Sequence, residues 1–175
     1  MTFTTRYEQC FNRLMELEGR SATDNKHDRG GLTYWGITRR AHPDWIGWQL
    51  LQDGATPEAM HRAVQCLYYD EYWVKVGGDG HKTDDFAFEL FEYAVNSGVG
   101  SAIRSLQFAL NLVGDDLDRD GKLGLKTKQA IEKIGEDVAS KLLNVEQAVL
   151  FRGLVISDPT QAGFYKGWIG KRVKI

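Results

Sequence analysis

The chain of 175 residues has few cysteines and prolines and no long hydrophobic run. Its two cysteines, Cys10 and Cys66, stand on apolar stripes of expected helices, so we expect buried free thiols, with one disulfide as the alternative. No zinc-ligand spacing accompanies them. No apolar run approaches the roughly 20 residues of a membrane-spanning helix, so no stable membrane insertion is expected.

A strong excess of either charge is also lacking, because the chain has 22 Lys and Arg and 24 Asp and Glu, which gives a net charge of −2. This balance argues against a generally basic nucleic-acid binder. The four histidines, at positions 27, 42, 61 and 81, have no ligand spacing and are expected at the surface. A solvated basic tail with a minor role in docking to an anionic polymer is expected from Lys166, Lys171, Arg172 and Lys174.

What the chain does contain, at its start, is an amphipathic helix over residues 5–18 that ends in a carboxylate. Thr5 and Glu8 have the spacing of a capping box. Apolar side chains then recur at helical spacing, at Tyr7, Cys10, Phe11, Leu14 and Met15. Positions 7, 11, 14 and 18 share one face, so Glu18 continues the apolar stripe until Gly19 ends the helix.

Two effects are expected to raise the pKa of Glu18. Partial burial disfavours the charged form, and the partial negative charge of a helix C-terminus repels a carboxylate. Burial is the larger effect, because a helix end contributes about 0.3–1 kcal/mol whereas burial shifts a pKa by up to several units. Such a carboxyl group suits a general acid. The alternative is a solvated glutamate at a frayed helix end.

The remaining pattern predicts a mainly α protein with one small β element. Residues 19–38 are rich in polar residues and glycine, and the pair Gly30-Gly31 predicts a short hairpin or an extended loop. Residues 39–56 are expected to be irregular. Further helices are expected from Thr56-Pro57 to before Gly77, over 84–97 (buried on nearly all sides), over 101–112 and over 136–156. An aromatic segment, 164–168, is expected to pack back on the body.

Three blocks carry a resemblance to a known family. The string E-G-x(8)-D-x-G-G-x-T-x-x-G-I-T, from Glu18 to Thr38, resembles the N-acetylmuramidase family of phage and bacterial lysozymes known for a Glu-Gly-Gly motif. Tyr72-Trp73 and residues 91–98 are similar to its second block, and residues 106–127 to the peptidoglycan-binding segment that usually follows. Arg20 departs from the pattern, which has a second glycine there, and this bears on the conformation of the loop.

The resemblance implies a lysozyme-like α+β fold with a small β-hairpin lobe and a helical lobe. It implies a muramidase part over 1–95 and a peptidoglycan-binding-like helical part over 96–175, packed into one compact unit. The reaction is hydrolysis of the β-1,4 bond between N-acetylmuramic acid and N-acetylglucosamine, with Glu18 protonating the departing oxygen. The expected protein is a phage-type endolysin, a monomer that acts on bacterial peptidoglycan and requires no cofactor.

A second catalytic group is needed, and related phage-type lysozymes place an Asp and then a Thr downstream of their acid. Asp28 and Thr33 fall at comparable distances from Glu18. Asp28 would orient water or stabilise charge, and Thr33 would help to hold that water. The alternatives are an Asx turn for Asp28 and a strand threonine for Thr33. Asp24 and Thr38 are the fallback candidates.

Three further residues are candidates for binding the glycan. Tyr34 and Trp35 are expected either to stack on sugar faces or to pack in the core. Asn96 is expected to hydrogen-bond an N-acetyl group or a backbone group near the glycan, or to serve as a satisfied cap at its helix end.

The loop Asp116-Leu117-Asp118-Arg119-Asp120-Gly121 matches the first half of a calcium-binding loop, with oxygen ligands at positions 1, 3 and 5 and glycine at 6. The twelfth position is Thr127, where a bidentate glutamate belongs, so calcium binding at Asp116, Asp118 and Asp120 is expected to be weak. The favoured reading is a glycine-bearing turn of the peptidoglycan-binding segment.

The alternative function is a non-catalytic peptidoglycan-binding protein that uses residues 96–175. A wall amidase or peptidase is disfavoured, because the sequence has neither metal-ligand spacing nor a Cys/His nucleophile pattern. The first residues, MTFTTRYEQC, show no signal-peptide pattern. We therefore expect synthesis in the host cytoplasm and release to the wall through a holin pore or a secretion machine.

Overall fold

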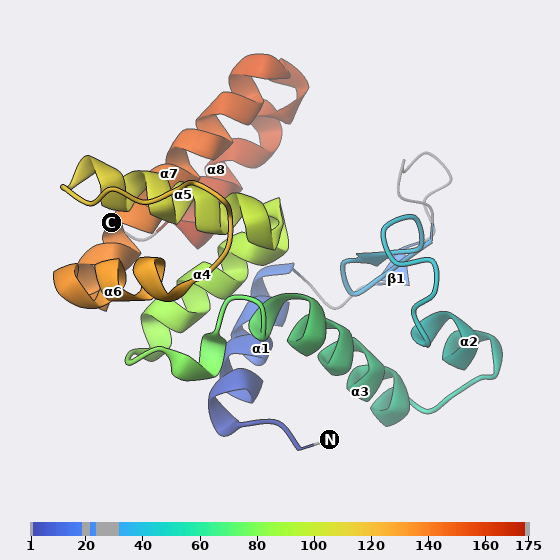
Figure 1. The fold of residues 1–175 in the computed structure, drawn as a ribbon. Helices are drawn as coiled ribbons and strands as arrows, with labels where there is room; N and C mark the ends of the chain where they lie inside the picture. Colours follow the sequence, from blue (N-terminus) through green and yellow to red (C-terminus); the bar gives the residue numbers. More distant parts are fainter. Residues whose placement is uncertain (1, 19–21, 24–31, 174–175) are drawn as a thin grey trace. The chain divides into compact units, whose positions relative to one another are not determined.

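The computed structural model describes residues 2–18, 22–23 and 32–173, and the chain divides into two compact units. The N-terminal unit is Met1–Glu71 and the C-terminal unit is Tyr72–Ile175. Figure 1 shows the elements of both along the chain. None of the helices in the described ranges combines the length and the apolar character of a membrane span.

The N-terminal unit contains helices and one antiparallel sheet. Its elements are α1 (Thr5–Glu18), β1 (Ala22–Thr23), β2 (Thr33–Tyr34), β3 (Ile37–Thr38), α2 (Gly47–Gln52) and α3 (Pro57–Tyr68). The short helix α2 corrects the expectation that 39–56 is irregular. Six residues are too few to show a helical repeat in sequence, and in the structure α2 buries Trp48, which is 4% exposed.

The buried face of α1 is the predicted one. Tyr7, Cys10, Phe11, Leu14 and Met15 are each 5% exposed or less. The predicted N-cap of α1, Thr5, is wrong by one residue. Thr4 is the cap, because its Oγ1 accepts a hydrogen bond from the amide of Tyr7 at 3.2 Å. At α3 the predicted cap is confirmed, since Thr56 Oγ1 accepts from the amide of Ala59 at 3.3 Å.

The sheet has the strand order β1-β2-β3, with both pairs antiparallel. Thr33 pairs with Thr38 and Tyr34 with Ile37, so Trp35 and Gly36 form a two-residue hairpin turn. The turn therefore lies at Trp35-Gly36, while the glycine pair at 30 and 31 lies outside the described residues. The small β element and the mainly α composition are confirmed.

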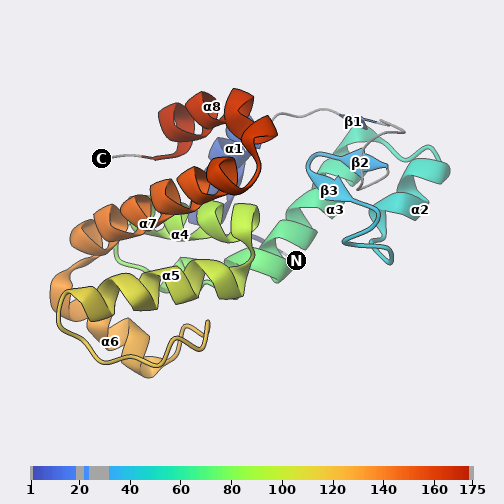
Figure 2. The same ribbon diagram turned by 90° about the horizontal axis from the view of Figure 1, so that it is seen from above.

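The chain enters the C-terminal unit through a π-helical turn, η1 (Tyr69–Trp73). The further elements are η2 (Gly78–Gly80), α4 (Asp84–Ser97), α5 (Val99–Leu112), α6 (Leu125–Ile134), α7 (Glu136–Ser157), η3 (Pro159–Gln161) and α8 (Ala162–Arg172). Helices α4, α5 and α7 pack against one another, as Figure 2 shows from above. All nine residues from Phe86 to Ala94 are buried, so the prediction of a central helix over 84–97 is confirmed.

A buried carboxylate, Glu92 of α4, holds the last helix in place. Arg172 Nη1 of α8 lies 2.5 Å from Glu92 Oε1, and Gln147 Nε2 of α7 lies 2.5 Å from Oε2. The Arg172 side chain is only 10% exposed, so the expectation that it belongs to a solvated tail is wrong. The expected aromatic closure is half right: Trp168 packs on Phe151, whereas Phe164 is 60% exposed.

Candidate active site

Helix α1 ends at the residue that the sequence singles out. Residue 18 stands seven positions after Phe11 and four after Leu14, both 0% exposed, so the helix register places it in line with the buried face. The side chain of Glu18 lies outside the described residues, as do Asp24 and Asp28.

The hairpin turn beyond β2 has an unusual backbone. Trp35 has φ 48° and Gly36 has φ 80°, as in a type I′ turn, which matches the twist of the flanking strands. The first of these positions usually holds Asn, Asp or Gly, and a bulky residue there costs about 1–2 kcal/mol. Tyr68 Oη of α3 donates to the carbonyl oxygen of Trp35 at 2.9 Å. A Cβ at Gly36 would lie 2.8 Å from that hydroxyl oxygen, so any other residue would strain the backbone and displace the Tyr68 hydroxyl.

A series of rings ties this turn to α1. The Phe11 ring stacks on His61 of α3, with centroids 5.7 Å apart, and His61 contacts Trp35 at 5.4 Å. The helix that carries residue 18 and the turn that carries Trp35 are thus fixed by the same ring of α3. The position of the hairpin relative to α1 is therefore set by packing within the N-terminal unit.

Tyr34 and Trp35 form a pair of nearly parallel rings. Their centroids are 5.9 Å apart and their planes differ by 3°. Both residues are half-buried, so each combines a packed face with accessible surface. Parallel, partly exposed aromatic faces are able to stack on sugar rings while also packing on the body, so the two readings of the sequence are compatible here.

The other predicted site residues lie in defined local environments. Thr33 is half-buried in β2, opposite Thr23 and Thr38. Thr38 Oγ1 accepts from the amide of Ala41 at 3.2 Å, a structural role for this fallback candidate. In the C-terminal unit, the exposed Asn96 donates through Nδ2 to the carbonyl oxygen of Glu92 at 2.9 Å and to its Oε1 at 2.8 Å.

The N-terminal unit also has a hollow of about 450 Å³, between the 41–46 loop and the end of α3. Of the predicted site residues whose side chains the structure describes, none lines it. Cys66 is one of its lining residues; it is partly exposed, Cys10 is buried, and the two are not joined by a disulfide. The disulfide alternative is thus absent from the structure.

The acidic loop is organised by Gln107 of α5, a buried residue. Gln107 Nε2 donates to Asp120 Oδ1 at 2.8 Å, and its Oε1 accepts from the amide of Gly121 at 3.0 Å. The hydrogen bond from Gln107 lowers the pKa of Asp120, and so does that from the amide of Lys122. Within the described ranges, no group of three acidic, histidine or cysteine side chains is arranged to hold a metal ion. This geometry supports the turn reading, and calcium binding stays a prediction.

Two residues of structural importance were missed by the sequence reasoning. His81, expected at the surface, is 9% exposed, because the Gly77–Gly80 turn folds it over Phe86. Its Nε2 lies 2.8 Å from the carbonyl oxygen of Val76. Tyr68 was recognised only as part of an apolar helix face. The turn that Tyr68 holds could have been predicted from the pattern Tyr34-Trp35-Gly36-Ile37, in which residues typical of strands stand on both sides of a glycine.

Comparison with known proteins adds three findings. Residues 11–98 match the glycosyl hydrolase 108 family, and residues 101–173 match a family described as a predicted peptidoglycan domain. Comparison with curated proteins gives no match. A solved structure of SagA from Brucella abortus has a TM-score of 0.69 at 24% identity, covering 94% of this chain and 88% of that chain. This likeness shows the fold, which is lysozyme-like and mainly α.

The family match includes the end of α1, the hairpin, α3 and α4, and the matched residues contain the catalytic candidates Glu18, Asp28 and Thr33. The second match covers α6, α7 and α8, together with most of α5. The chain belongs to the glycosyl hydrolase 108 family and is an N-acetylmuramidase, a glycoside hydrolase that acts on peptidoglycan.

Proposed function

We propose that Glu18 is the general acid of this muramidase. The observation that carries the proposal is the register of α1, which ends at residue 18 on the face where Phe11 and Leu14 are fully buried. We expect the Glu18 carboxyl group to be partly removed from water because it continues this face, and removal from water favours the protonated form. A protonated carboxyl group is what the leaving glycosidic oxygen needs at neutral pH.

In the proposed reaction Glu18 donates its proton to the glycosidic oxygen while the sugar gains oxocarbenium character. Asp28 is the proposed second carboxylate, which orients water or stabilises the developing charge. Thr33 is proposed to hold that water. Its support is its place in β2, two residues before the turn that Tyr68 and His61 fix, because a positioned hydroxyl requires a fixed strand.

Tyr34 and Trp35 are proposed to bind sugar rings. Their nearly parallel planes and their partial exposure support this role. Asn96 is proposed to hydrogen-bond an N-acetyl group through its amide. The contacts of its Nδ2 with Glu92 fix the orientation in which the amide would be presented.

The test compares the digestion of purified peptidoglycan by the native chain, by Glu18→Gln and by Glu16→Gln. Glu16 is exposed on the same helix, so its substitution is the matched control. We expect Glu18→Gln to lower the rate by about 10²–10⁴-fold, the usual contribution of a general acid, and Glu16→Gln to keep it. Mass spectrometry of the products should show new reducing-end muramic acid.

Two results would reject the proposal. Full activity of Glu18→Gln would remove Glu18 from the mechanism. New ends at amide bonds, in place of reducing-end muramic acid, would contradict the muramidase reaction itself.

The wall lies beyond the cytoplasmic membrane, so an enzyme made inside the cell needs a route to it. We propose an endolysin-like release through a holin pore or a secretion machine. The support is the nature of the substrate. Cells that express the chain with and without a holin should differ in the rate at which their turbidity falls, and equal rates would exclude the holin pore.

A further inference from the structure

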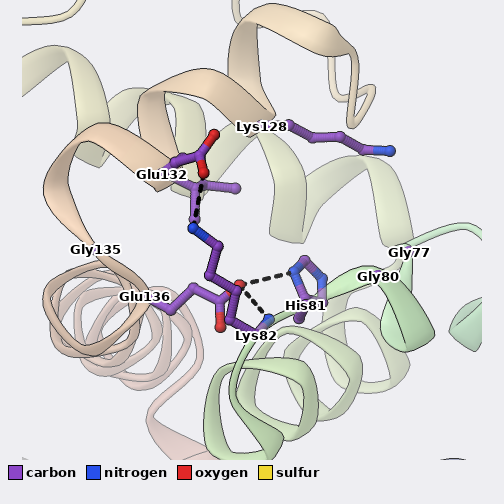
Figure 3. Close-up of a pocket in the computed structure, with 9 residues that line it drawn as sticks. Gly77, Gly80, His81, Lys82, Lys128, Glu132, Gly135 and Glu136 are labelled. Atoms are coloured by element: carbon purple, nitrogen blue, oxygen red, sulfur yellow. Dashed lines mark hydrogen bonds and ion pairs between the residues drawn. The ribbon is translucent and has the colours of Figure 1, made fainter.

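The C-terminal unit contains a cavity of about 290 Å³ that has no role in the proposed glycosidic chemistry. It lies between the 77–82 segment, which precedes α4, and the junction of α6 with α7 (Figure 3). Its size is at the lower end of the range for ligand pockets, so it suits the end of a short chain more than a disaccharide. Both matched family segments contribute to its walls, 77–82 from the first and 128–136 from the second.

The groups that line this cavity are charged. Lys128 of α6 is exposed, and within the described chain it has no hydrogen-bond or ion-pair partner; Figure 3 shows its side chain extended along one edge. Lys82 Nζ lies 2.7 Å from Glu132 Oε1, and both of these side chains are more than two-thirds exposed. An ion pair so exposed to water is weak, so a ligand that carries both charges can exchange with it readily.

The back wall of the cavity is fixed by a second carboxylate. Glu136 Oε1 accepts from the amide of Lys82 at 2.7 Å, and Oε2 accepts from the amide and the hydroxyl of Thr83 at 2.6 and 2.9 Å. His81 Nδ1 lies 3.7 Å from Glu136 Oε1, and the His81 side chain is 7% exposed. Glu136 is thus occupied by the protein itself, which leaves Lys128, Lys82 and Glu132 to meet a ligand.

The chemistry of peptidoglycan decides which part of it matches these groups. Its glycan strand presents neutral hydroxyl and N-acetyl groups, while its carboxylates and free amines belong to the stem peptides. Among the described residues that line it, none is Phe, Tyr or Trp, the side chains that offer stacking faces to sugars. A cavity with an unpaired ammonium group and an exchangeable ion pair therefore matches the peptide and not the glycan.

We propose that this cavity binds the charged end of a peptidoglycan stem peptide, with a peptide carboxylate on Lys128 and a peptide ammonium group on Glu132. The proposal rests on the function proposed above, since it names a second part of the same substrate. The peptide contact would hold the wall polymer on the C-terminal unit while the glycan is cut by the N-terminal residues.

The direct test is a titration of the full chain with a sugar-free stem tetrapeptide that contains diaminopimelate, followed by heteronuclear NMR. We expect shifts at residues 77–82 and 128–136 and a roughly tenfold weaker affinity in Lys128→Glu, because a charge reversal converts attraction into repulsion. Lys126→Glu is the matched control, since Lys126 is exposed on the same helix and does not line the cavity. Its affinity should stay within about twofold of the native value.

A second arm tests the ammonium contact. The native chain should bind the peptide with a free side-chain amine more tightly than the same peptide with that amine acetylated, and Glu132→Gln should lose this preference. Absence of peptide binding by the native chain, or equal losses in Lys128→Glu and Lys126→Glu, would overturn the proposal. Equal affinity of the native chain for the two peptides would overturn the assignment of Glu132.

A third arm separates this proposal from the muramidase chemistry. The substrates are intact peptidoglycan and glycan strands stripped of their peptides by an amidase. The ratio of the two hydrolysis rates should fall in Lys128→Glu and stay constant in Lys126→Glu; a constant ratio in both contradicts the peptide site. The catalytic proposal fails separately, if Glu18→Gln cuts the stripped strands at the native rate. That result does not depend on the ratio of the two rates in the lysine variants.

Discussion

The two units satisfy their buried polar groups in different ways. In the N-terminal unit, aromatic donors bind backbone carbonyls: Tyr68 Oη binds Trp35 at 2.9 Å, and Trp48 Nε1 binds His42 at 2.6 Å. In the C-terminal unit, side chains bind one another, as Glu92 does with Gln147 and Arg172. The hairpin and the 42–48 segment of the N-terminal unit are thus held through backbone carbonyls, and helices α4, α7 and α8 of the C-terminal unit through paired side chains.

The physical reason lies in the lengths of the elements. Long helices satisfy most of their own backbone groups, so the carboxylate of Glu92, buried on α4, takes partners from other side chains, Gln147 and Arg172. Two-residue strands and turns leave carbonyl groups without ladder partners, and these need donors from elsewhere. A large aromatic side chain supplies such a donor together with apolar area, so it fixes a loop and fills the core at once.

The largest effect on stability is expected from Arg172→Ala. The substitution leaves the carboxylate of Glu92, which is 1% exposed, without its cation, and breaking a buried ion pair in this way costs about 3–5 kcal/mol. Urea unfolding of the full chain measures the loss. Lys171→Ala, the exposed neighbour, should change stability little, and equal midpoints for the two variants would show that Glu92 does not depend on Arg172.

Gly36→Ala should have a smaller effect, of about 2 kcal/mol, because alanine is strained at positive φ and its Cβ meets Tyr68 Oη. Gly54→Ala is the control, since Gly54 also has positive φ but has no atom within 4 Å of an added Cβ. The difference between the two measures the contact with Tyr68, and Tyr68→Phe should reduce it. Equal losses of stability in Gly36→Ala and Gly54→Ala would mean that only the positive φ, and not the contact with Tyr68, requires glycine at position 36.

Glu136 should make stability depend on pH. Burial acts to raise its pKa, but the hydrogen bonds from Lys82 and Thr83 and the nearby His81 outweigh burial, so the pKa lies below its ordinary value of 4.5. Unfolding raises that pKa, so Glu136 stabilises the fold above about pH 4.5 and loses this contribution as the pH falls further, through the folded pKa. Glu136→Gln should flatten the acid side of a denaturation profile. The exposed Asp137→Asn is the control, and an unchanged slope in Glu136→Gln would contradict this role.

The smallest effect is expected from calcium. We propose that the enzyme needs no cofactor and that Asp116, Asp118 and Asp120 bind calcium weakly, because Asp120 Oδ1 already accepts from Gln107 and from the amide of Lys122. Calorimetry should detect weak binding to the native chain and none to the Asp118→Asn, Asp120→Asn variant. Tight binding would reject the turn as the main role of the loop. The monomeric state stays a prediction for light scattering.

Much of the helical structure could be predicted because it depends on neighbours in the chain. The buried face of α1, the Thr56 cap and the central position of α4 each follow from residues within four positions of one another. The same local logic placed residue 18 on its face. The turn at Trp35-Gly36 was missed because a tryptophan is not the residue type that usually precedes glycine in such a turn.

The sequence by itself determined the longer helices α1, α4, α5 and α7, the apolar face that leads to Glu18 and the ordered blocks of a muramidase, because helical periodicity and motif spacing are local properties. Only the tertiary structure decided which distant groups meet. Arg172 reaches Glu92 across 80 positions, Glu136 reaches Thr83 across 53, and Tyr68 reaches Trp35 across 33. Such pairs form because buried polar groups must find partners, and packing, not spacing in the chain, determines which partners are near.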